Sequence, residues 1–229
     1  MQVKPLLTDI CSMRILLCAA TSFEIGPTTA FIRQEGLGDR VAVLVTGIGL
    51  LATTHALTRE VLTHRPRMII QAGIAGSFDD RAALGSTIAI SAETVADLGV
   101  TEGGRFRTVQ DLGLQPANDA PWQNGWLPNP HKDLLETANL PTARSITINE
   151  ITTDAARIAF YKERFDPAVE SMEGAALHYV GLQENIPFLQ LRAISNSVGE
   201  RDKSRWLMKE SIASLNECLQ KFIIQTLDI

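Results

Sequence analysis

Three polar residues stand at positions where this chain could carry out chemistry. Glu24 follows an apolar run that is typical of a strand, and we place it in a polar turn at residues 21–26. Glu173 lies where a helix should begin, and Asn196 follows the nearly continuous apolar run of residues 187–195. Ligands of open α/β sheets bind beyond the carboxyl ends of the strands. A carboxylate at a helix start and an amide at a strand end could therefore meet at one ligand.

Each carboxylate also has a simpler interpretation. Glu24 could be a general base, which must be ionisable and open to water, or an ordinary carboxylate favoured by the positive end of a helix. Sequence alone favours the helix interpretation, and Glu173 has the same two alternatives. A carboxylate suits a pair of sugar hydroxyls because it offers several lone pairs and no donor. Arg192 lies inside an apolar run and needs a partner if buried, so we predict that it anchors Glu173 or another acid.

The residues Gly47-Ile48-Gly49, with Ala52, match a dinucleotide-binding fingerprint. The acidic residue that would support this reading is missing at the end of the next strand, where residues 71–73 are Gln-Ala-Gly. The alternative is a tight turn between a strand and a helix. We interpret the motif as that turn, and a nucleotide titration would test the nicotinamide reading.

Apolar runs alternate with helical patterns along the chain, which predicts an α/β fold. We expect one domain at residues 13–229, preceded by an N-terminal extension at residues 1–12. The helix that begins near Glu173 should end at Asn185 and Pro187, with one apolar face. That face comprises Met172, Ala175, Ala176, Tyr179 and Val180. The other expected strands are 14–20, 41–45, 68–71, 87–90 (able to continue to 95), 143–148 and 168–170, and the other helices are 50–64, 131–138, 154–164 and 206–227.

Residues 97–130 differ from the rest of the chain. They are rich in glycine and proline and contain Trp122 and Trp126. The segment is too long for an ordinary connector and too aromatic for a disordered one. We predict an ordered excursion that covers a site or an interface.

The composition excludes several classes of function. The net charge of the 229 residues is −5, without the basic run that binding to a nucleic-acid polymer would need. No apolar stretch approaches the roughly 20 residues that span a bilayer, so we expect no membrane segment. The scattered histidines and the lack of a CxxC pair give a metal site little support. An odd cysteine count without a signal peptide indicates reduced thiols and a cytoplasmic location.

Several segments together resemble the nucleoside phosphorylase/hydrolase superfamily. They occur in the family's order and are residues 19–25, 47–49, 73–76, 171–175 (Ser-Met-Glu-Gly-Ala) and 192–196 (Arg-Ala-Ile-Ser-Asn). The resemblance implies a three-layer α/β/α fold with a central mixed sheet. It also implies a small-molecule nucleoside as the partner, no metal or organic cofactor, and a homo-oligomer that is a dimer or a dimer of dimers.

The resemblance also implies a role for individual residues. Glu24 would position and activate an attacking water, Met172 would pack under the ribose, and Glu173 would accept from the ribose hydroxyls. The remaining implied contacts are with the purine base. They are Ala75, Gly76, Glu150 and Ile151, whose backbone would line the base, and Ser195 and Asn196, which would meet its imidazole edge.

Asn196 departs from the adenine-releasing nucleosidases of the superfamily, which carry an aspartate there. An aspartate can protonate N7 of the departing base, whereas an asparagine can only donate a hydrogen bond as charge builds on it. The amide can also donate to O6 of a 6-oxopurine. The substitution therefore predicts hypoxanthine rather than adenine as the leaving group.

Water, rather than phosphate, is the expected co-substrate. A phosphate needs a glycine-rich loop and arginines around its oxygens, whereas residues 19–24 contain neither glycine nor arginine and end in Glu24. A 6-oxopurine nucleoside phosphorylase, an adenine-releasing nucleosidase and a non-catalytic nucleoside-binding protein remain alternatives. The group on the ribose 5′ carbon is not determined by the sequence. If that group is acidic, the candidates to bind it are Arg105, Arg107 and Arg201.

Overall fold

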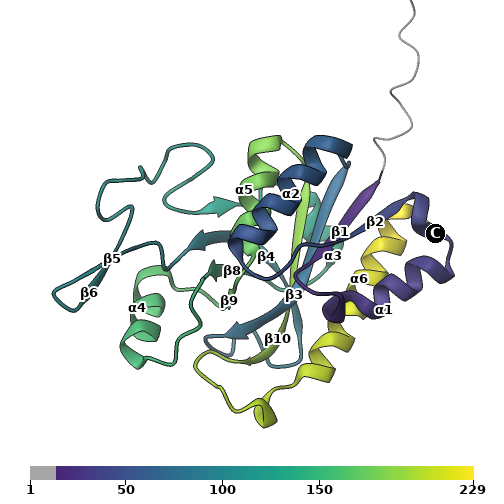
Figure 1. Ribbon diagram of the computed structural model, residues 1–229. Coiled ribbons are helices and arrows are strands. Elements are labelled where there is room, and N and C mark those ends of the chain that lie inside the picture. Colours follow the sequence, from purple (N-terminus) through teal and green to yellow (C-terminus); the bar gives the residue numbers. More distant parts are fainter. Residues whose placement is uncertain (1–13) are drawn as a thin grey trace, which may run out of the picture.

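The computed structural model describes residues 14–229. The expected extension at residues 1–12, and Met13, lie outside the described residues. Figure 1 shows a sheet with helices on both of its faces. The strands are β1 (Ile15–Ala19), β2 (Val41–Val45), β3 (Met68–Ser77), β4 (Thr87–Val95), β5 (Gly99–Glu102), β6 (Arg105–Thr108), β7 (Leu127–Pro128), β8 (Thr142–Thr147), β9 (Val169–Ser171) and β10 (Phe188–Ser197). The helices are α1 (Ser22–Gln34), α2 (Leu50–His64), α3 (Lys132–Ala138), α4 (Ala155–Phe165), α5 (Gly174–Glu184) and α6 (Met208–Leu227), with 3-10 turns at Leu37–Asp39 and Lys203–Arg205.

The central sheet is mixed, as expected. Strand β3 is parallel to β1 and to β10, whereas β4 is antiparallel to β10 and β9 is antiparallel to β3. Because β8 joins β4 to β9, the strands β3, β10, β4, β8 and β9 form a closed ring, from which β1 and β2 extend. The ring closes because β3 is long: its first residues pair with β1, and Gly76 and Ser77 pair with β9.

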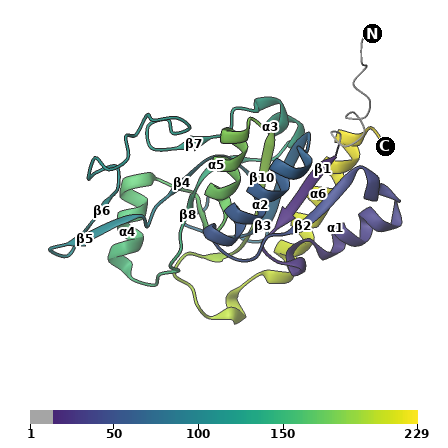
Figure 2. The same cartoon turned by 45° about the horizontal axis from the view of Figure 1, so that its top comes forward.

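Strand β1 shows why the central strands read as continuous apolar runs. Its residues Ile15, Leu17 and Ala19 pack into one core cluster together with α1 and α6. The intervening Leu16 and Cys18 pack into a second cluster, with residues of α2 and α5. Successive side chains of a strand point to opposite faces, so a strand covered on both sides must be apolar throughout. Figure 2 shows α2 beside α5 and α1 beside α6, consistent with these two clusters.

Three differences from the sequence prediction concern the elements around the future site residues. Helix α1 begins at Ser22, so Glu24 is in its first turn and not in an irregular turn. Strand β3 continues through glycines 73 and 76 to Ser77, because pairing with β10 and β9 keeps these residues extended. Helix α5 is buried nearly all round instead of on one face, and Tyr179, placed on the apolar face, is 40% exposed.

Residues 97–130 form an ordered excursion on the side of the sheet remote from α1 (Figure 1). Strands β5 and β6 make a hairpin, and the chain later returns as β7 to pair with β4. The hairpin packs on α4, where the Phe106 and Phe160 rings are 5.4 Å apart and the Arg157 guanidinium lies 4.2 Å from the centre of the Phe106 ring. Among the helices of residues 14–229, none is both long enough and apolar enough to cross a bilayer.

Candidate active site

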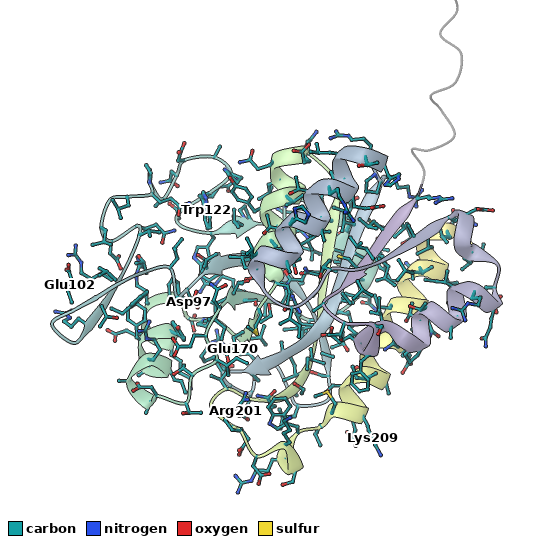
Figure 3. All side chains as sticks on the ribbon, viewed as in Figure 1. Asp97, Glu102, Trp122, Glu170, Arg201 and Lys209 are labelled. Carbon is teal, nitrogen blue, oxygen red and sulfur yellow. The ribbon has the colours of Figure 1, made fainter. Side chains whose placement is uncertain are left out.

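A pocket of about 270 Å³ lies where β1, β3 and β10 end. This is the edge at which ligands of α/β sheets are expected. In Figure 3, two of the residues that line it, Glu170 and Arg201, lie between α4 and α6. The lining consists of Ala20, Thr21, Phe23, Glu24, Ile48, Ile74, Ala75, Gly76, Ile148, Ile151, Glu170, Ser171, Met172, Glu173, Ser195, Asn196, Arg201, Trp206 and Met208.

Glu24 is held rigidly at the start of α1. Its Oε2 accepts hydrogen bonds from the backbone N and the Oγ1 of Thr21, each at 2.9 Å, which forms a capping box with the residue that precedes the helix. Its Oε1 accepts from the backbone N of Ile74 at 3.1 Å. The two interpretations of Glu24 are therefore compatible, because the carboxylate that caps the helix also lines the pocket.

Gly73 allows two charged groups to approach each other. A Cβ atom at this position would lie 2.9 Å from Oε1 of Glu24 and 2.5 Å from Nη1 of Arg192. Both distances are too short for a real Cβ, so a side chain here would displace the two groups. Glycine is needed at this position because of the close approach, not because of its backbone angles.

Glu173 precedes the first turn of α5 and has donors on both carboxylate oxygens. The backbone N of Gly49 donates to Oε1 at 3.0 Å, and Nη1 of Arg192 lies 3.4 Å from Oε2. Arg192 is 1% exposed and also donates from Nη2 to Oε1 of Gln71 at 3.1 Å. The prediction that Arg192 anchors Glu173 or another acid is confirmed, and the acid is Glu173. Glu173 is therefore a buried, paired carboxylate that faces the pocket.

The glycine motif before α2 forms the tight turn that we predicted. Gly47 and Gly49 have φ angles of 86° and 91°, which glycine adopts far more readily than other residues. This backbone directs the N–H of Gly49 towards Glu173. The donor that a dinucleotide-binding turn would offer to a pyrophosphate is used here by a carboxylate of the same chain.

At the other end of the pocket, Ser195 orients the amide of Asn196. The pairing of β10 with β3 shifts register between Ile194 and Asn196, which places both polar residues at an irregularity of the strand. The Oγ of Ser195 donates to Oδ1 of Asn196 at 2.8 Å, and Nδ2 of Asn196 donates to the carbonyl of Ser197 at 2.9 Å. An amide nitrogen has two hydrogens. Asn196 therefore has a second N–H with which to bind a ligand.

Glu170 is a pocket residue that the sequence reasoning missed. It is 7% exposed, and its Oε2 has no hydrogen-bond partner among the described residues. Burial, together with the nearby charge of Asp97, raises the pKa of Glu170 to about 7. The available signal was an acidic residue at the end of a short apolar strand, next to the motif that begins at Ser171.

The fold brings most of the predicted site residues into this one pocket. Glu150 is the exception: it lines a separate cavity beside Phe106 and α4, and its backbone N donates to Asp97 at 3.1 Å. No residue of the segment 97–130 lines the pocket, so this excursion does not cover it. The predicted residues that do line it are Glu24, Ala75, Gly76, Ile151, Met172, Glu173, Ser195 and Asn196.

The structure separates the three candidate arginines. Arg201 lines the pocket, with its guanidinium 5.8 Å from the centre of the Trp206 ring. Arg105 and Arg107 line other cavities near the β5–β6 hairpin. Within residues 14–229, no group of three or more histidines, cysteines or acidic residues is arranged to hold a metal ion.

Comparison with known proteins agrees with this architecture. The model of the Phosphorylase superfamily matches residues 17–228. A futalosine hydrolase of Streptomyces coelicolor is 33% identical over 197 residues, which cover 83% of this chain and 81% of the relative. A 5′-methylthioadenosine/S-adenosylhomocysteine nucleosidase of Shewanella oneidensis is 30% identical, with 77% and 75% covered.

The solved structure of a Helicobacter pylori futalosine hydrolase has the same fold. Its TM-score is 0.76 at 17% sequence identity, and the match covers 92% of this chain and 97% of that one. The identity is low enough that this match speaks for the fold alone. The family model and the sequence relatives show that the chain belongs to the Phosphorylase superfamily and is an N-glycosyl hydrolase related to these nucleosidases.

Proposed function

We propose that the protein hydrolyses the N-glycosidic bond of futalosine and releases hypoxanthine and dehypoxanthine futalosine, as a step of menaquinone biosynthesis. The observation that carries this proposal is the oriented amide of Asn196. Ser195 donates to its oxygen and Nδ2 donates to Ser197, which holds the amide in one orientation and leaves a second N–H for the ligand. A 6-oxopurine presents acceptors at O6 and N7, whereas adenine presents an amino group at position 6. The futalosine hydrolase among the sequence relatives supports the same substrate.

The proposed reaction assigns one task to each polar residue. As the bond between the sugar and the base stretches, positive charge develops on the ribose and negative charge on the purine. Glu24 takes a proton from the attacking water, and Met172 packs under the ribose while Glu173 accepts from its hydroxyls. The backbone of Ala75, Gly76 and Ile151 lines the base. Asn196 stabilises the departing base by a hydrogen bond that strengthens as charge builds up.

Hydrolysis fits the pocket better than phosphorolysis. A phosphate dianion needs several donors and cations around its oxygens. The ionisable residues that line the pocket are Glu24, Glu170, Glu173 and Arg201. Glu24 occupies the loop after β1, and its negative charge would repel phosphate there.

Arg201 supports the proposed group on the ribose 5′ carbon. Futalosine carries an aromatic carboxylate there, which needs a cation and an apolar surface. Arg201 beside Trp206 offers both within the pocket. We propose that these two residues bind the acidic tail.

A single substrate panel tests the proposal. Futalosine, inosine, methylthioadenosine and adenosylhomocysteine are each incubated with and without phosphate, and release of the base is followed. We expect futalosine to react fastest, without phosphate, and to give no ribose 1-phosphate. Faster cleavage of methylthioadenosine than of futalosine would contradict the proposed substrate. A strict need for phosphate would contradict the proposed hydrolysis.

The variant Asn196→Asp sharpens the same panel. A carboxylate cannot donate to O6 but can accept from the amino group of adenine when ionised. We expect the ratio of kcat/KM for methylthioadenosine to that for futalosine to rise about tenfold or more. An unchanged ratio would show that Asn196 does not select the base.

We also propose that the protein is a cytoplasmic homo-oligomer built from dimers. Ile48, which lines the pocket, and Leu51, in the first turn of α2, are 65% and 87% exposed. Exposed apolar side chains that cluster are typical of interaction surfaces. Sedimentation velocity is the test, and a monomer at micromolar concentration would contradict the proposal.

A further inference from the structure

Glu170 is a buried carboxyl group inside the pocket that the mechanism above does not use. Its side chain lines the pocket, and its Oε2 is buried without a hydrogen-bond partner in the described part of the chain. A buried polar atom usually has a partner, and each exception needs an explanation. Because no donor stabilises a negative charge on this buried oxygen, the protonated form of Glu170 is favoured.

The strand pairing places Glu170 opposite Asn196. Gly76 of β3 is in register with Glu170 of β9 on one side and with Asn196 of β10 on the other. Residues in register on neighbouring strands project from the same face of the sheet. A Cβ atom at Gly76 would lie 3.2 Å from Cγ2 of Val198, 3.5 Å from Nδ2 of Asn196 and 3.5 Å from Cγ of Glu170. The glycine therefore leaves a gap that these two polar side chains flank together with Val198.

This gap suits the edge of a 6-oxopurine that carries O6 and N7. Both atoms are acceptors, so each needs a donor. Asn196 has a free N–H to offer, and a protonated Glu170 would offer its O–H. Asparagine cannot act as an acid, which leaves the proton for the departing base unassigned. Of the groups that flank Gly76, Glu170 is the one able to supply it.

We propose that Glu170 is the general acid that protonates N7 of the departing purine, while Asn196 donates to O6. This inference rests on the proposed function, because it requires a 6-oxopurine nucleoside as the substrate. The bond between C1′ and N9 breaks and its electron pair moves onto the purine. The O–H bond of Glu170 breaks as the N7–H bond forms, and Glu24 takes a proton from the water whose oxygen bonds to C1′. The base leaves neutral, and exchange with solvent resets both carboxyl groups.

The surroundings of Glu170 favour the protonated form. Its in-register neighbours, Gly76 of β3 and Ile146 of β8, carry no charge, nor does Asn196. The titratable groups near it are Asp97, which follows β4, and Tyr161 on α4. Glu24, Glu173 and Arg201 are the other charged residues of the pocket lining. Burial and the charge of Asp97 raise the pKa of Glu170 to about 7, which suits an acid that works near neutral pH.

The leaving group provides the sharpest test. The variant Glu170→Gln is compared with the natural protein on two substrates. One is the 6-oxopurine nucleoside that reacts fastest in the panel, and the other is 4-nitrophenyl β-ribofuranoside, whose nitrophenolate leaves without a proton. We expect kcat for the nucleoside to fall about 10²- to 10⁴-fold with a much smaller loss on the nitrophenyl substrate. Equal losses on both substrates would overturn the proposal and make Glu170 a residue that only shapes the pocket.

The pH profile is an independent measurement. For the natural protein, kcat/KM for the nucleoside should fall as the pH rises above about 7, because Glu170 then loses its proton. This basic limb should be absent in Glu170→Gln. A basic limb that persists unchanged in the variant would contradict the assignment. If the natural protein cleaves no 6-oxopurine nucleoside at all, it is the proposed function that fails, and the two failures are thus distinguished.

Glu93 offers a matched control. It is also fully buried with a raised pKa, but it bonds to Gln190 and Thr147 and does not line the pocket. Any loss of activity in Glu93→Gln should therefore be the same for both substrates. If Glu93→Gln shows a dependence on the leaving group as large as that of Glu170→Gln, loss of any buried carboxyl group has this effect. That result would also overturn the proposal.

Discussion

The two ends of the pocket treat a buried carboxyl group in opposite ways. At the end assigned to the sugar, Glu173 has a donor on each oxygen, from the backbone of Gly49 and from the guanidinium of Arg192. At the end assigned to the base, Oε2 of Glu170 has no donor within the described residues. The negative charge of Asp97 adds to the effect of burial and raises the pKa of Glu170 further. The two residues are three positions apart in the sequence and are almost equally buried, at 6% and 7% exposed.

The difference shows that two equally buried carboxyl groups can suit different chemistry when only one of them has hydrogen-bond donors. Burial alone disfavours the charged form, whereas a cation and hydrogen-bond donors favour it. Glu173 is paired with Arg192 and suits the task of accepting from hydroxyl groups. Glu170 retains a proton near neutral pH and suits the task of giving one away. Pairs of acidic groups with opposed environments commonly divide acid and base work in this manner.

The largest effect should come from the carboxylate that we assign to water activation. Glu24→Gln keeps one oxygen, which can accept from Thr21 and cap helix α1, whereas its NH2 group takes the place of the acceptor of the Ile74 N–H. We expect kcat to fall about 10²- to 10⁴-fold, while hypoxanthine binds within a few-fold of its original affinity by calorimetry. Glu35→Gln, an exposed change at the end of the same helix, is the control and should leave kcat unaltered. If Glu24→Gln lowers the affinity for hypoxanthine as much as it lowers kcat, the assignment of Glu24 to water activation is wrong.

The next effect should come from removing the partner at the sugar end. Arg192→Leu leaves Glu173 buried without its counter-charge, which should lower the free energy of unfolding by about 3–5 kcal/mol. Urea denaturation measures this change. The double variant Arg192→Leu with Glu173→Gln should recover part of the loss. Arg205→Leu breaks the exposed pair with Glu200 and should cost less than about 1 kcal/mol. Similar losses of unfolding free energy in Arg192→Leu and Arg205→Leu would contradict the distinction between the buried and the exposed ion pair.

The smallest effect should be a pH-dependent stabilisation at the base end. The pKa of Glu170 is raised from 4.5 to about 7 in the folded protein, so the folded state binds its proton more tightly than the unfolded chain does. The natural protein therefore loses stability as the pH rises between these two values. Glu170→Gln lacks this penalty and should gain up to about 3 kcal/mol relative to the natural protein between pH 4.5 and pH 8. Urea unfolding across this range is the measurement, and a pH-independent difference would contradict the raised pKa.

Much of this architecture could be predicted from local patterns. The alternation of strands and helices, the turn at Gly47–Gly49 and the need of Arg192 for an acidic partner were all anticipated. Each rests on a local or strongly constrained rule, such as the apolar character of a strand covered on both sides or the need of a buried arginine for a partner. Residues 21–26 were assigned to a turn, although helix α1 begins at Ser22. The bonds of Glu24 to Thr21 and Ile74 show how tertiary structure completes that helix start.

The missed features depend on contacts between distant segments. The extension of β3 through its glycines requires β9 and β10 as neighbours, and no local propensity predicts it. Glu150 and Ile151 are adjacent in sequence, yet Ile151 faces the pocket and Glu150 lines another cavity. Which of two neighbouring residues faces the pocket depends on how the whole segment packs against the rest of the fold.

The sequence by itself determined the chemical repertoire of the pocket: an amide at Asn196 instead of an acid, carboxyl groups at Glu24, Glu170 and Glu173, and an arginine in an apolar strand. These are covalent facts that folding does not change. Only the tertiary structure decided which carboxyl group is paired and which is left without a donor. The physical reason is that the partners of a buried acid come from other segments of the chain: Gly49 and Arg192 bond to Glu173, whereas burial first and Asp97 second raise the pKa of Glu170.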